Sequence, residues 1–292
     1  FQNDVFKSYY LKKLDSIKKA DLFLAISESC RKEVINAGLG ISPEKVVEIS
    51  SAANEQFYST ETKTLSGLSS VGIVKPFLLT ISNVDPNKNF MTLLAAYARL
   101  DAVLRADYQL VVVIEEPAHA IIHQSMRKLG LSEEEVVTLD NVSDEILLDL
   151  YRNGFLYVLP SVHEGFGLPA LEAMKCGTPA IGSNTTSIPE VIGRKDALFD
   201  PTSPEDIARV IERVMRDRRF YDELVHHALN HAAKFSWEKV ANRVWDAVEN
   251  LVPSPVSQEQ AAADTLPRLA MVGPLPPEQT GIAYYCAELL PG

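Results

Sequence analysis

Short apolar runs alternate with amphipathic stretches of helical period through the middle of the chain. The runs that predict strands are residues 77–81, 109–114, 136–139, 156–159 and 179–182, with a short one near Leu198. In the first intervening stretch Phe90, Leu93, Leu94 and Tyr97 recur at the spacing of one helix face. Alternating strands and helices over this length predict an α/β fold with a doubly wound parallel sheet and right-handed crossovers.

Composition and pattern divide the chain into four segments. Residues 1–72 begin with helix and strand patterns, and Ser27 is the expected N-cap of the second helix. The end of this segment, 59–72, is rich in Ser, Thr and Gly. We expect this segment to be the remnant of a truncated second α/β domain, with 59–72 a linker without structure of its own. The doubly wound domain is expected over 73–252, where Trp237 begins its last helix. Residues 253–267 have a linker composition, and 268–292 look like the first strand and loop of a further domain.

Charge and cysteine content limit the class of partner. The chain has 28 basic and 39 acidic side chains and a formal net charge of −11, which argues against nucleic acid as a partner. Cys30, Cys176 and Cys286 match no metal-ligand spacing, so we expect buried thiols in a reducing compartment. No apolar run approaches the ~20 residues that span a bilayer. We therefore expect a cytoplasmic location, with attachment to the inner face of the membrane through other parts of a longer protein as an alternative.

A glycine-containing loop follows the predicted strand 156–159. It holds Gly165 and Gly167 and leads into a helix over 168–176, for which Pro169 suits the first turn. Ligands bind at the carboxyl ends of the strands of a doubly wound sheet, and backbone N–H groups at a helix N-terminus favour an anion. The loop is therefore a predicted phosphate site.

Two glutamates flank this helix start. Glu164 precedes the helix, and Glu172 lies about one turn inside it. A carboxylate accepts hydrogen bonds from two neighbouring hydroxyls at once, so the pair suits a polyhydroxylated ligand. Two glutamates at this separation also occur by chance, but their place around the glycine loop favours a ligand site. His163, beside Glu164, is expected to be a partly exposed loop histidine.

The stretch Pro160-Ser-Val-His-Glu-Gly-Phe-Gly-Leu-Pro-Ala-Leu-Glu-Ala-Met-Lys-Cys-Gly-Thr-Pro179 resembles the signature of the family 4 glycosyltransferases. Residues 143–151, 187–191 and 235–238 resemble segments that flank that signature, and 21–58 resemble the end of the family's amino-terminal domain. The resemblance covers about residues 4–251. It implies the Rossmann-like carboxyl-terminal domain of a retaining GT-B enzyme, which takes a sugar from a GDP- or UDP-linked donor.

The resemblance also implies roles for individual residues. Glu164 would contact hydroxyls of the transferred sugar, and Lys88 would bind the diphosphate and stabilise the leaving group. The other donor contacts implied are Gly165, Phe166, Gly167 and Leu168 around the sugar and diphosphate, Glu172 at the ribose, and Asn141 and Val142 at the base. No metal or other cofactor is expected, because lysine and the helix dipole would neutralise the diphosphate and the chain has no Asp-x-Asp pair.

Two departures from the family pattern leave an alternative open. Asn83 and Asn87 are expected donor contacts near the lysine, but they stand where the family commonly has arginine. The Gly-rich turn after the second strand is replaced by residues 114–117. The glutamates at 115 and 116 would repel a diphosphate, and an asparagine lacks the bidentate grip of arginine. A degenerate module that holds nucleotide or positions its neighbours therefore stays open. A GT-B phosphorylase or epimerase is disfavoured, because those enzymes lack this glutamate loop.

The end of the chain predicts tandem organisation. Residues 268–290 resemble the opening of another such transferase, with a glycine loop at Gly281. The resemblance extends to polymerising mannosyltransferases that build O-antigen chains, which favours GDP-mannose as donor and a growing glycan as acceptor. Neighbouring modules of the same polypeptide are expected partners. Because most of the acceptor site would lie in the missing part of the amino-terminal domain, we expect no sugar transfer by this chain alone.

Overall fold

The computed structural model describes residues 4–59, 65, 67–83, 85–114, 119–251 and 269–271. The chain divides into two compact units. The small unit comprises Phe1–Ser51 with Trp237–Gly292, and the large unit comprises Ala52–Ser236. Each unit is built on a parallel sheet.

The large unit contains the predicted doubly wound sheet. Its strands are β3 (Phe77–Ile81), β4 (Gln109–Val113), β5 (Val136–Leu139), β6 (Leu156–Leu159), β7 (Ala180–Ser183) and β8 (Leu198–Phe199). They lie in the order β5-β4-β3-β6-β7-β8 and pair in parallel throughout. The strand order reverses between β3 and β6, and such a switch point is where doubly wound sheets bind ligands. The predicted fold class is confirmed, and the strand ends differ from the prediction by one residue at most in β3 to β7.

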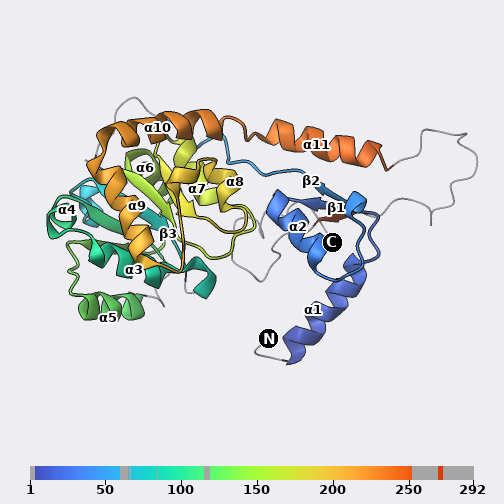
Figure 1. Cartoon of the computed structure of the whole chain (residues 1–292), viewed down its shortest axis with the longest axis horizontal. Coiled ribbons are helices and arrows are strands. Elements are labelled where there is room, and N and C mark those ends of the chain that lie inside the picture. Colours follow the sequence, from blue (N-terminus) through green and yellow to red (C-terminus); the bar gives the residue numbers. More distant parts are fainter. Residues whose placement is uncertain are drawn as a thin grey trace, which may run out of the picture. The chain divides into compact units, whose positions relative to one another are not determined.

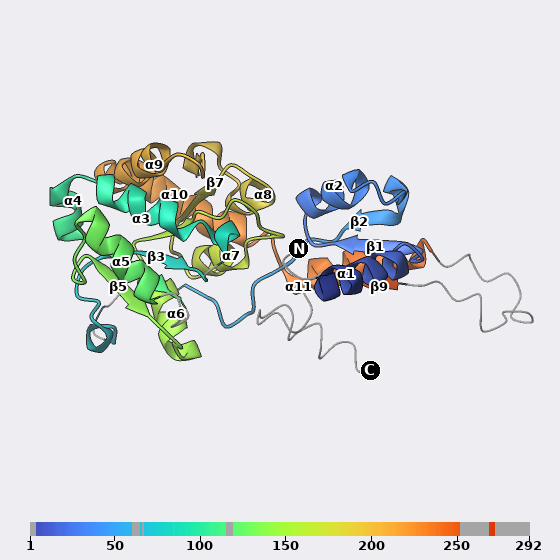
Figure 2. The ribbon, with the colours of Figure 1, turned by 90° about the horizontal axis from the view of Figure 1, so that it is seen from below.

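Helices enclose this sheet (Figure 1, Figure 2). They are α3 (Phe90–Arg99), α4 (Ala102–Asp107), α5 (His119–Leu129), α6 (Asp144–Asn153), α7 (Leu168–Lys175), α8 (Ile188–Ile192), α9 (Pro204–Arg216) and α10 (Arg218–Ala232), with the 3-10 helices η2 (Ser69–Val71), η3 (Pro86–Lys88) and η5 (Lys195–Ala197). α3 packs against α9 and α5, whereas α7 packs against α6, α8 and α10. Strands covered in this way are apolar along their length, as in β6, whose four residues are all buried. Within the described part of the chain, no helix is long and apolar enough to cross a membrane.

The segment before the sheet is more ordered than its composition predicted. We expected 59–72 to be a linker without structure, but its described part contains η2, and Leu68 is only 1% exposed. Ile73 is fully buried directly after it. The buried side chain of Gln109 accepts a hydrogen bond from the backbone N–H of Val74 at 2.9 Å, which joins this segment to β4. Apolar anchors among the small polar residues thus fix the segment to the sheet.

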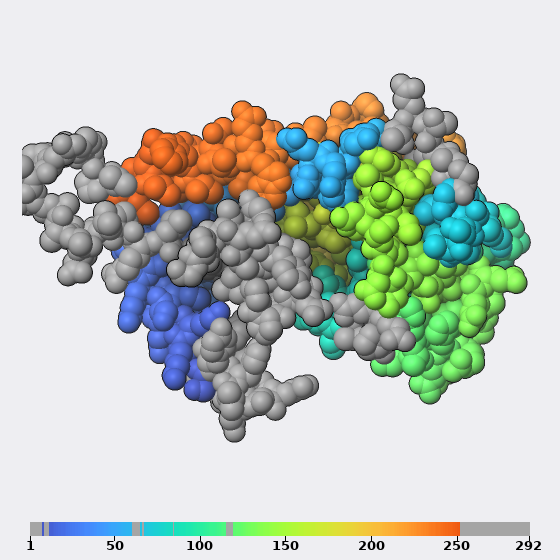
Figure 3. Space-filling view, turned by 180° about the vertical axis from the view of Figure 1, so that it is seen from behind, coloured from blue at the N-terminus to red at the C-terminus, as the bar shows by residue number. Residues whose placement is uncertain are grey.

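The small unit has a three-stranded parallel sheet in the order β2-β1-β9. Its elements are α1 (Asp4–Ile17), β1 (Leu22–Ala25), α2 (Glu28–Asn36), η1 (Pro43–Lys45), β2 (Val46–Glu48), α11 (Trp237–Glu249) and β9 (Leu269–Met271). Ser27 caps α2, as predicted, by accepting a hydrogen bond from the N–H of Cys30. Its core contains Phe23 of β1 and Val46 of β2. Figure 3 shows α11, in orange, against the blue amino-terminal elements of the same unit.

The two units divide the chain at other positions than the expected boundaries at 72 and 252. The helix α11 belongs to the small unit because it packs on β1 and because Arg243 on α11 forms an ion pair with Glu48 of β2 at 3.0 Å. The first strand expected within 268–292 is β9, whose Leu269 pairs with Leu22 of β1, so it belongs to the sheet of the small unit. The expected linker 253–267, the glycine loop at 281 and the third cysteine lie outside the described residues.

Gly193 provides a test of the packing between α8 and α10. It has φ +67°, and a β-carbon there would run into the imidazole ring of His231. We expect Gly193→Ala to lower the free energy of unfolding by about 2–4 kcal/mol, because it adds a clash to left-handed backbone strain. Gly130 has φ +70° with nothing within 4 Å, so Gly130→Ala is expected to cost only about 1 kcal/mol. Denaturant unfolding of both variants measures the difference, and equal losses would contradict this packing argument.

Candidate functional site

Two loops meet where the strand order reverses. The loop after β3 carries Lys88 and the loop after β6 carries Glu164, and their Nζ and Oε1 atoms lie 2.8 Å apart. The side chain of Lys88 is 30% exposed and that of Glu164 is 13% exposed. Since β3 and β6 are parallel neighbours, their carboxyl ends bring together two residues that are 76 positions apart in sequence. The structure thus unites the two predicted catalytic residues at the switch point.

The loop around Lys88 folds for local reasons. The Asp85 carboxylate caps η3 by accepting a hydrogen bond from the N–H of Asn87 at 2.8 Å, and Pro86 fixes the first turn. The side-chain oxygen of Asn83 accepts from the N–H of Asp85 at 2.9 Å. Asn83 and Asn87 were expected to face the donor. Here the side chain of Asn83 and the N–H of Asn87 shape the turn that presents the lysine.

Hydrogen bonds to backbone groups join the Lys88 loop to the loop after β6. Asn89 adopts the left-handed region at φ 54°, which asparagine tolerates, and its amide donates to the carbonyls of Pro160 at 2.9 Å and Pro201 at 2.8 Å. The N–H of Val162 donates to the carbonyl of Asn87 at 2.8 Å. These contacts set the separation of the two loops, and therefore of their charged side chains.

The carboxylate of Glu164 receives a second donor from its own loop. The hydroxyl of Ser161, which is 1% exposed, donates to the same Oε1 atom at 2.7 Å. A charged donor and a neutral donor on one oxygen offset part of the cost of removing the carboxylate from water. The arrangement fixes the side chain in one orientation.

Sequence reasoning missed three consecutive hydroxyl residues that hold the backbone of the Glu164 loop. Thr185 donates to the carbonyl of Val162 at 3.1 Å, Thr186 accepts from the N–H of Glu164 at 3.1 Å, and Ser187 donates to the carbonyl of Glu164 at 2.8 Å. We call residues 185–187 the hydroxyl triplet. Their position directly after a buried strand, next to the signature loop in the sheet order, was the available signal.

The start of α7 follows the same loop. Gly167 has φ +107°, and a β-carbon there would lie 3.2 Å from Cδ2 of Leu159, so both backbone and space require glycine. Phe166 is 3% exposed and packs edge-on against Phe235 with ring centroids 5.7 Å apart. Its ring is therefore part of the core, and only its backbone is available to a ligand. Gly165 precedes it, and Leu168 is the first residue of the helix, with Gly167 as its cap.

Glu172 lies on α7 and is held by Tyr151 of α6. The phenol of Tyr151 donates to Oε2 of Glu172 at 2.7 Å. Burial raises the pKa of Glu172 above that of an ordinary carboxyl, and the hydrogen bond from Tyr151 opposes the rise. Burial, together with Glu172, also holds the pKa of Tyr151 well above its usual value, so the phenol stays a donor. Tyr151 is a further supporting residue that the sequence did not single out.

Asn141 and Val142, predicted at the base, follow β5, which is separated from β3 by β4. They lie at the carboxyl edge of the sheet but not beside Lys88 in the strand order. Asn141 has φ 48° and donates through its amide to Oδ2 of Asp140 at 3.1 Å. The other oxygen of Asp140, Oδ1, is buried and has no hydrogen-bond partner among the described residues. Glu115 and Glu116 lie outside the described residues.

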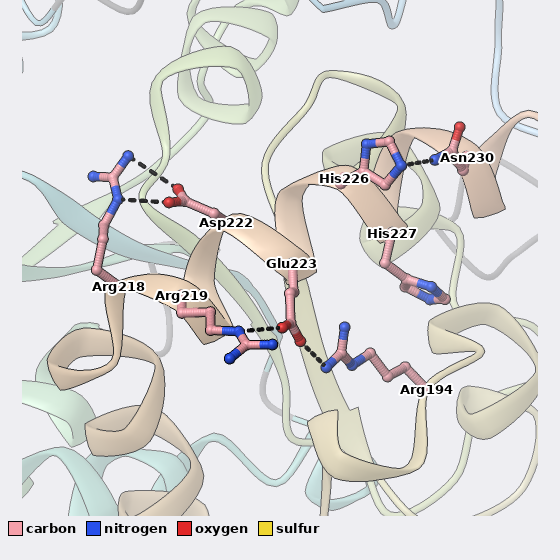
Figure 4. A pocket seen from close by; sticks show the side chains of 8 residues that line it. All are labelled: Arg194, Arg218, Arg219, Asp222, Glu223, His226, His227 and Asn230. Atoms are coloured by element: carbon pink, nitrogen blue, oxygen red, sulfur yellow. Dashed lines mark hydrogen bonds and ion pairs between the residues drawn. The ribbon is translucent and has the colours of Figure 1, made fainter.

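A shallow groove of about 870 Å³ lies elsewhere on the large unit, along α10 (Figure 4). Its lining residues are Arg194, Arg218, Arg219, Asp222, Glu223, His226, His227 and Asn230. Both carboxylates of the groove are paired with arginine, since Glu223 contacts Arg194 at 2.9 Å and Arg219 at 3.1 Å, and Asp222 contacts Arg218 at 3.0 Å. The groove therefore lacks the convergent, partly buried polar groups of the switch point, and we place the functional site at the switch point.

The sheet order and the switch point between β3 and β6 define a doubly wound α/β domain, a class that commonly binds its ligands at such a switch point. Comparison with protein families makes this specific. The model of the family "Glycosyl transferases group 1" matches residues 72–234, and the chain belongs to this family.

Curated relatives include bacterial mannosyltransferases. The serotype-specific mannosyltransferase WbdA of Escherichia coli is 39% identical over 91% of this chain, which corresponds to 34% of WbdA. The O-antigen chain mannosyltransferase B of the same species is 30% identical over 81% of this chain and 62% of its own length. The chain thus spans about a third of the length of the first of these relatives.

Solved glycosyltransferase structures share the fold. Anabaena HepE in complex with UDP and glucose superimposes with a TM-score of 0.68 at 21% identity, covering 79% of this chain and 63% of HepE. Sucrose-phosphate synthase from Thermosynechococcus elongatus gives a TM-score of 0.71 at 23% identity, covering 84% of this chain and 62% of that enzyme. The chain therefore has the GT-B type of architecture that the sequence motif implied.

Glu172→Gln tests the electrostatic cost of the site. A raised carboxyl pKa means that ionisation of Glu172 costs folding stability once the pH exceeds ~4.3, the value of an ordinary glutamate. The amide of glutamine avoids that ionisation and still accepts from Tyr151. We expect Glu172→Gln to raise the free energy of unfolding at pH 7 by on the order of 1 kcal/mol, with the gain disappearing as the pH falls towards 4.

Urea unfolding between pH 4 and 8 measures this effect. The exposed Glu134 provides the control, because Glu134→Gln removes the same charge at the surface and is expected to change stability by less than about 0.5 kcal/mol. A Glu172→Gln variant that is less stable than wild type at pH 7 would show that the ionised carboxylate stabilises the fold.

Proposed function

We propose that the large unit binds a nucleotide-sugar donor at the switch point and serves a retaining hexosyltransferase, with GDP-mannose as the favoured donor. The observation that carries this proposal is the 2.8 Å contact between Lys88 and Glu164 across the ends of β3 and β6. A cation and a carboxylate at that place match the two chemically different parts of a donor, its diphosphate and its sugar hydroxyls.

Binding would exchange one ion pair for two ligand contacts. In the structure Lys88 is paired with Glu164. When a diphosphate approaches, its greater negative charge competes for the ammonium group, and Oε1 of Glu164 becomes available to sugar hydroxyls. Lys88 then stabilises the negative charge that develops on the leaving diphosphate, which is where a fixed positive charge accelerates bond cleavage most.

Other segments of the large unit would contact the remaining parts of the donor. Backbone groups of residues 165–168 meet the diphosphate and sugar at the start of α7, where exposed N–H groups favour an anion. Glu172, fixed by Tyr151, accepts from the ribose hydroxyls. Residues 141–142 meet the base.

The reaction would move mannose to a growing glycan such as an O-antigen chain. The names of the E. coli relatives support mannose and this acceptor class. In a retaining reaction the donor phosphate assists the incoming acceptor hydroxyl on the face that the diphosphate leaves, and Glu164 orients the sugar rather than attacking it. Neighbouring modules of a longer polypeptide, at the inner face of the cytoplasmic membrane, would supply the rest of the acceptor site.

A degenerate module that holds nucleotide without turnover is the second candidate. Asn83 and Asn87, which stand at the arginine positions of the family, favour this candidate. The side-chain oxygen of Asn83 and the N–H of Asn87 form hydrogen bonds within the turn before Lys88. Sugar transfer by the longer parent protein distinguishes the two, because Glu164→Ala would abolish transfer only if this module is catalytic.

Calorimetric titration with GDP, UDP and ADP tests the donor site in this chain. We expect a nucleoside diphosphate to bind and Lys88→Ala to weaken that binding roughly 10- to 100-fold, since it removes a charge-assisted contact and leaves Glu164 facing the phosphates unpaired. Lys128→Ala, at an exposed position at the end of α5, is the control and should bind like wild type. No binding of any of the three nucleotides by the folded chain would overturn the donor-site proposal.

Metal removal gives a separate test. Because Lys88 and the start of α7 are proposed to neutralise the diphosphate, the nucleotide should bind equally well in EDTA and in millimolar Mg²⁺. Titrations in the two buffers measure this. A loss of affinity of about tenfold or more in EDTA would show that a cation completes the site.

A further inference from the structure

We propose that the hydroxyl triplet, residues 185–187, consists of positioning residues that hold the Glu164 loop in the geometry that the transferred sugar requires. This inference rests on the proposed function of Glu164. It goes beyond the signature motif, because the triplet lies outside that motif and follows a different strand.

The pattern of contacts is specific to the loop backbone. Three adjacent side chains reach successive backbone groups of one loop, namely the carbonyl of Val162, the N–H of Glu164, and the carbonyls of Glu164 and Phe166. A loop that follows a strand has no ladder partner for these groups. Side-chain hydroxyls therefore provide the hydrogen bonds that a sheet would otherwise supply.

Ser187 binds the Glu164 loop in place of capping its own helix. It is the N-cap residue of α8, and a serine at that position usually accepts a hydrogen bond from the first turn of its own helix. Ser187 makes no such cap bond. Its fully buried hydroxyl instead lies 2.8 Å from the carbonyl of Glu164 and 2.9 Å from that of Phe166. Helix stability alone does not explain this serine.

Thr186 adopts a backbone conformation that its side chain disfavours. Its φ is 50°, in the left-handed region where a β-branched residue is an outlier. Such strain persists only where neighbouring structure imposes it, and it is concentrated at functional sites. The conformation lets Thr186 accept from the N–H of Glu164 while Ser187 binds the carbonyl of the same residue. Both backbone groups of Glu164 are therefore fixed from one turn.

This support matters most once donor is bound. In the structure Oε1 of Glu164 is held by Lys88 and Ser161. When Lys88 turns to the diphosphate, the side chain loses its charged partner. The triplet does not depend on that ion pair, so it keeps the Glu164 backbone in place, and a small displacement at a sugar contact costs much of its benefit.

The test compares affinities for a nucleotide with and without its sugar. Calorimetry gives dissociation constants of this chain for GDP-mannose and GDP, and for UDP-glucose and UDP. For whichever nucleotide sugar and nucleotide bind, we take the ratio of their two dissociation constants as the measure of the sugar contact. Glu164→Gln removes this contact and therefore shows by what factor the ratio changes when the contact is lost. We expect Thr186→Val and Ser187→Ala to change the ratio in the same direction by at least half that factor, and to change the affinity for the bare nucleotide less than threefold. Thr186→Ser, which keeps the hydroxyl, should restore the wild-type ratio.

Asp217→Ala is the matched structural control. Asp217 caps α10 by accepting from the N–H of Phe220 at 3.0 Å. It follows α9, which runs back from the carboxyl end of β8, so it lies at the opposite edge of the sheet from the site. This variant should lower the unfolding midpoint and keep the wild-type ratio. If Ser187→Ala does not fold, Thr185→Val replaces it.

The outcomes separate this inference from the proposed function. A wild-type ratio in Thr186→Val, when Glu164→Gln shifts it, overturns the positioning role and leaves the donor site standing. A ratio unchanged in Glu164→Gln overturns the inference because Glu164 does not then contact the sugar, although nucleotide binding persists. Absence of binding to either pair by wild type overturns both.

Discussion

The parallel pairing of β3 with β6 places the two charged groups on which the site depends. Leu78 pairs with Leu156 and Leu79 with Tyr157, so both strands end at the same edge and their loops emerge side by side. Along the chain the sheet winds away from this pair in both directions, which is the arrangement that defines a switch point. The contacts of Asn89 with Pro160 and Pro201 then hold the loop of Lys88 against two neighbouring loops.

Burying carboxylates under this edge opposes folding, and the structure supplies a donor for each of them. Glu164 receives Lys88 and Ser161, and Glu172 receives Tyr151. These donors reduce but do not remove the cost for Glu172, whose pKa stays raised by burial. A carboxylate that is poorly hydrated and only partly satisfied gains more from ligand hydroxyls than one already in water. We therefore expect Glu172 to lower the stability of the domain and to gain from a ligand hydroxyl.

Support for the Glu164 loop reaches back through a short helix to the outer layer. Ser187 begins α8, and α8 ends at Gly193, where the backbone closely approaches the ring of His231 on α10. His231 also contacts the carbonyl of Glu190 at 3.1 Å. Packing between α8 and α10 therefore sets the position of the hydroxyl triplet, and through it the position of the loop. Residues remote from the ligand edge contribute to its geometry in this way.

The sequence by itself determined the fold class, the strands of the large sheet and the glycine–glutamate loop. Alternating periodicity and helix-start residues such as Ser27, which caps α2, are local signals that do not depend on distant contacts. The sequence could not show that Leu68 anchors residues 67–72, because the burial of a side chain depends on distant partners such as β4. For the same reason the place of α11 was decided only by its contacts with β1 and β2.

Tertiary structure alone also decided the supporting residues of the site. The sequence assigned no site role to Tyr151 or to the hydroxyl triplet, because each acquires its role from a hydrogen bond to a group at least 20 positions away. Lys88 and Glu164 were identified from their motifs, but their contact follows from strand order, which short-range pattern does not encode. The spacing of apolar residues determines which face of each helix or strand is buried. Which loops lie next to each other depends on the order of the strands in the sheet, and this order is seen only in the folded chain.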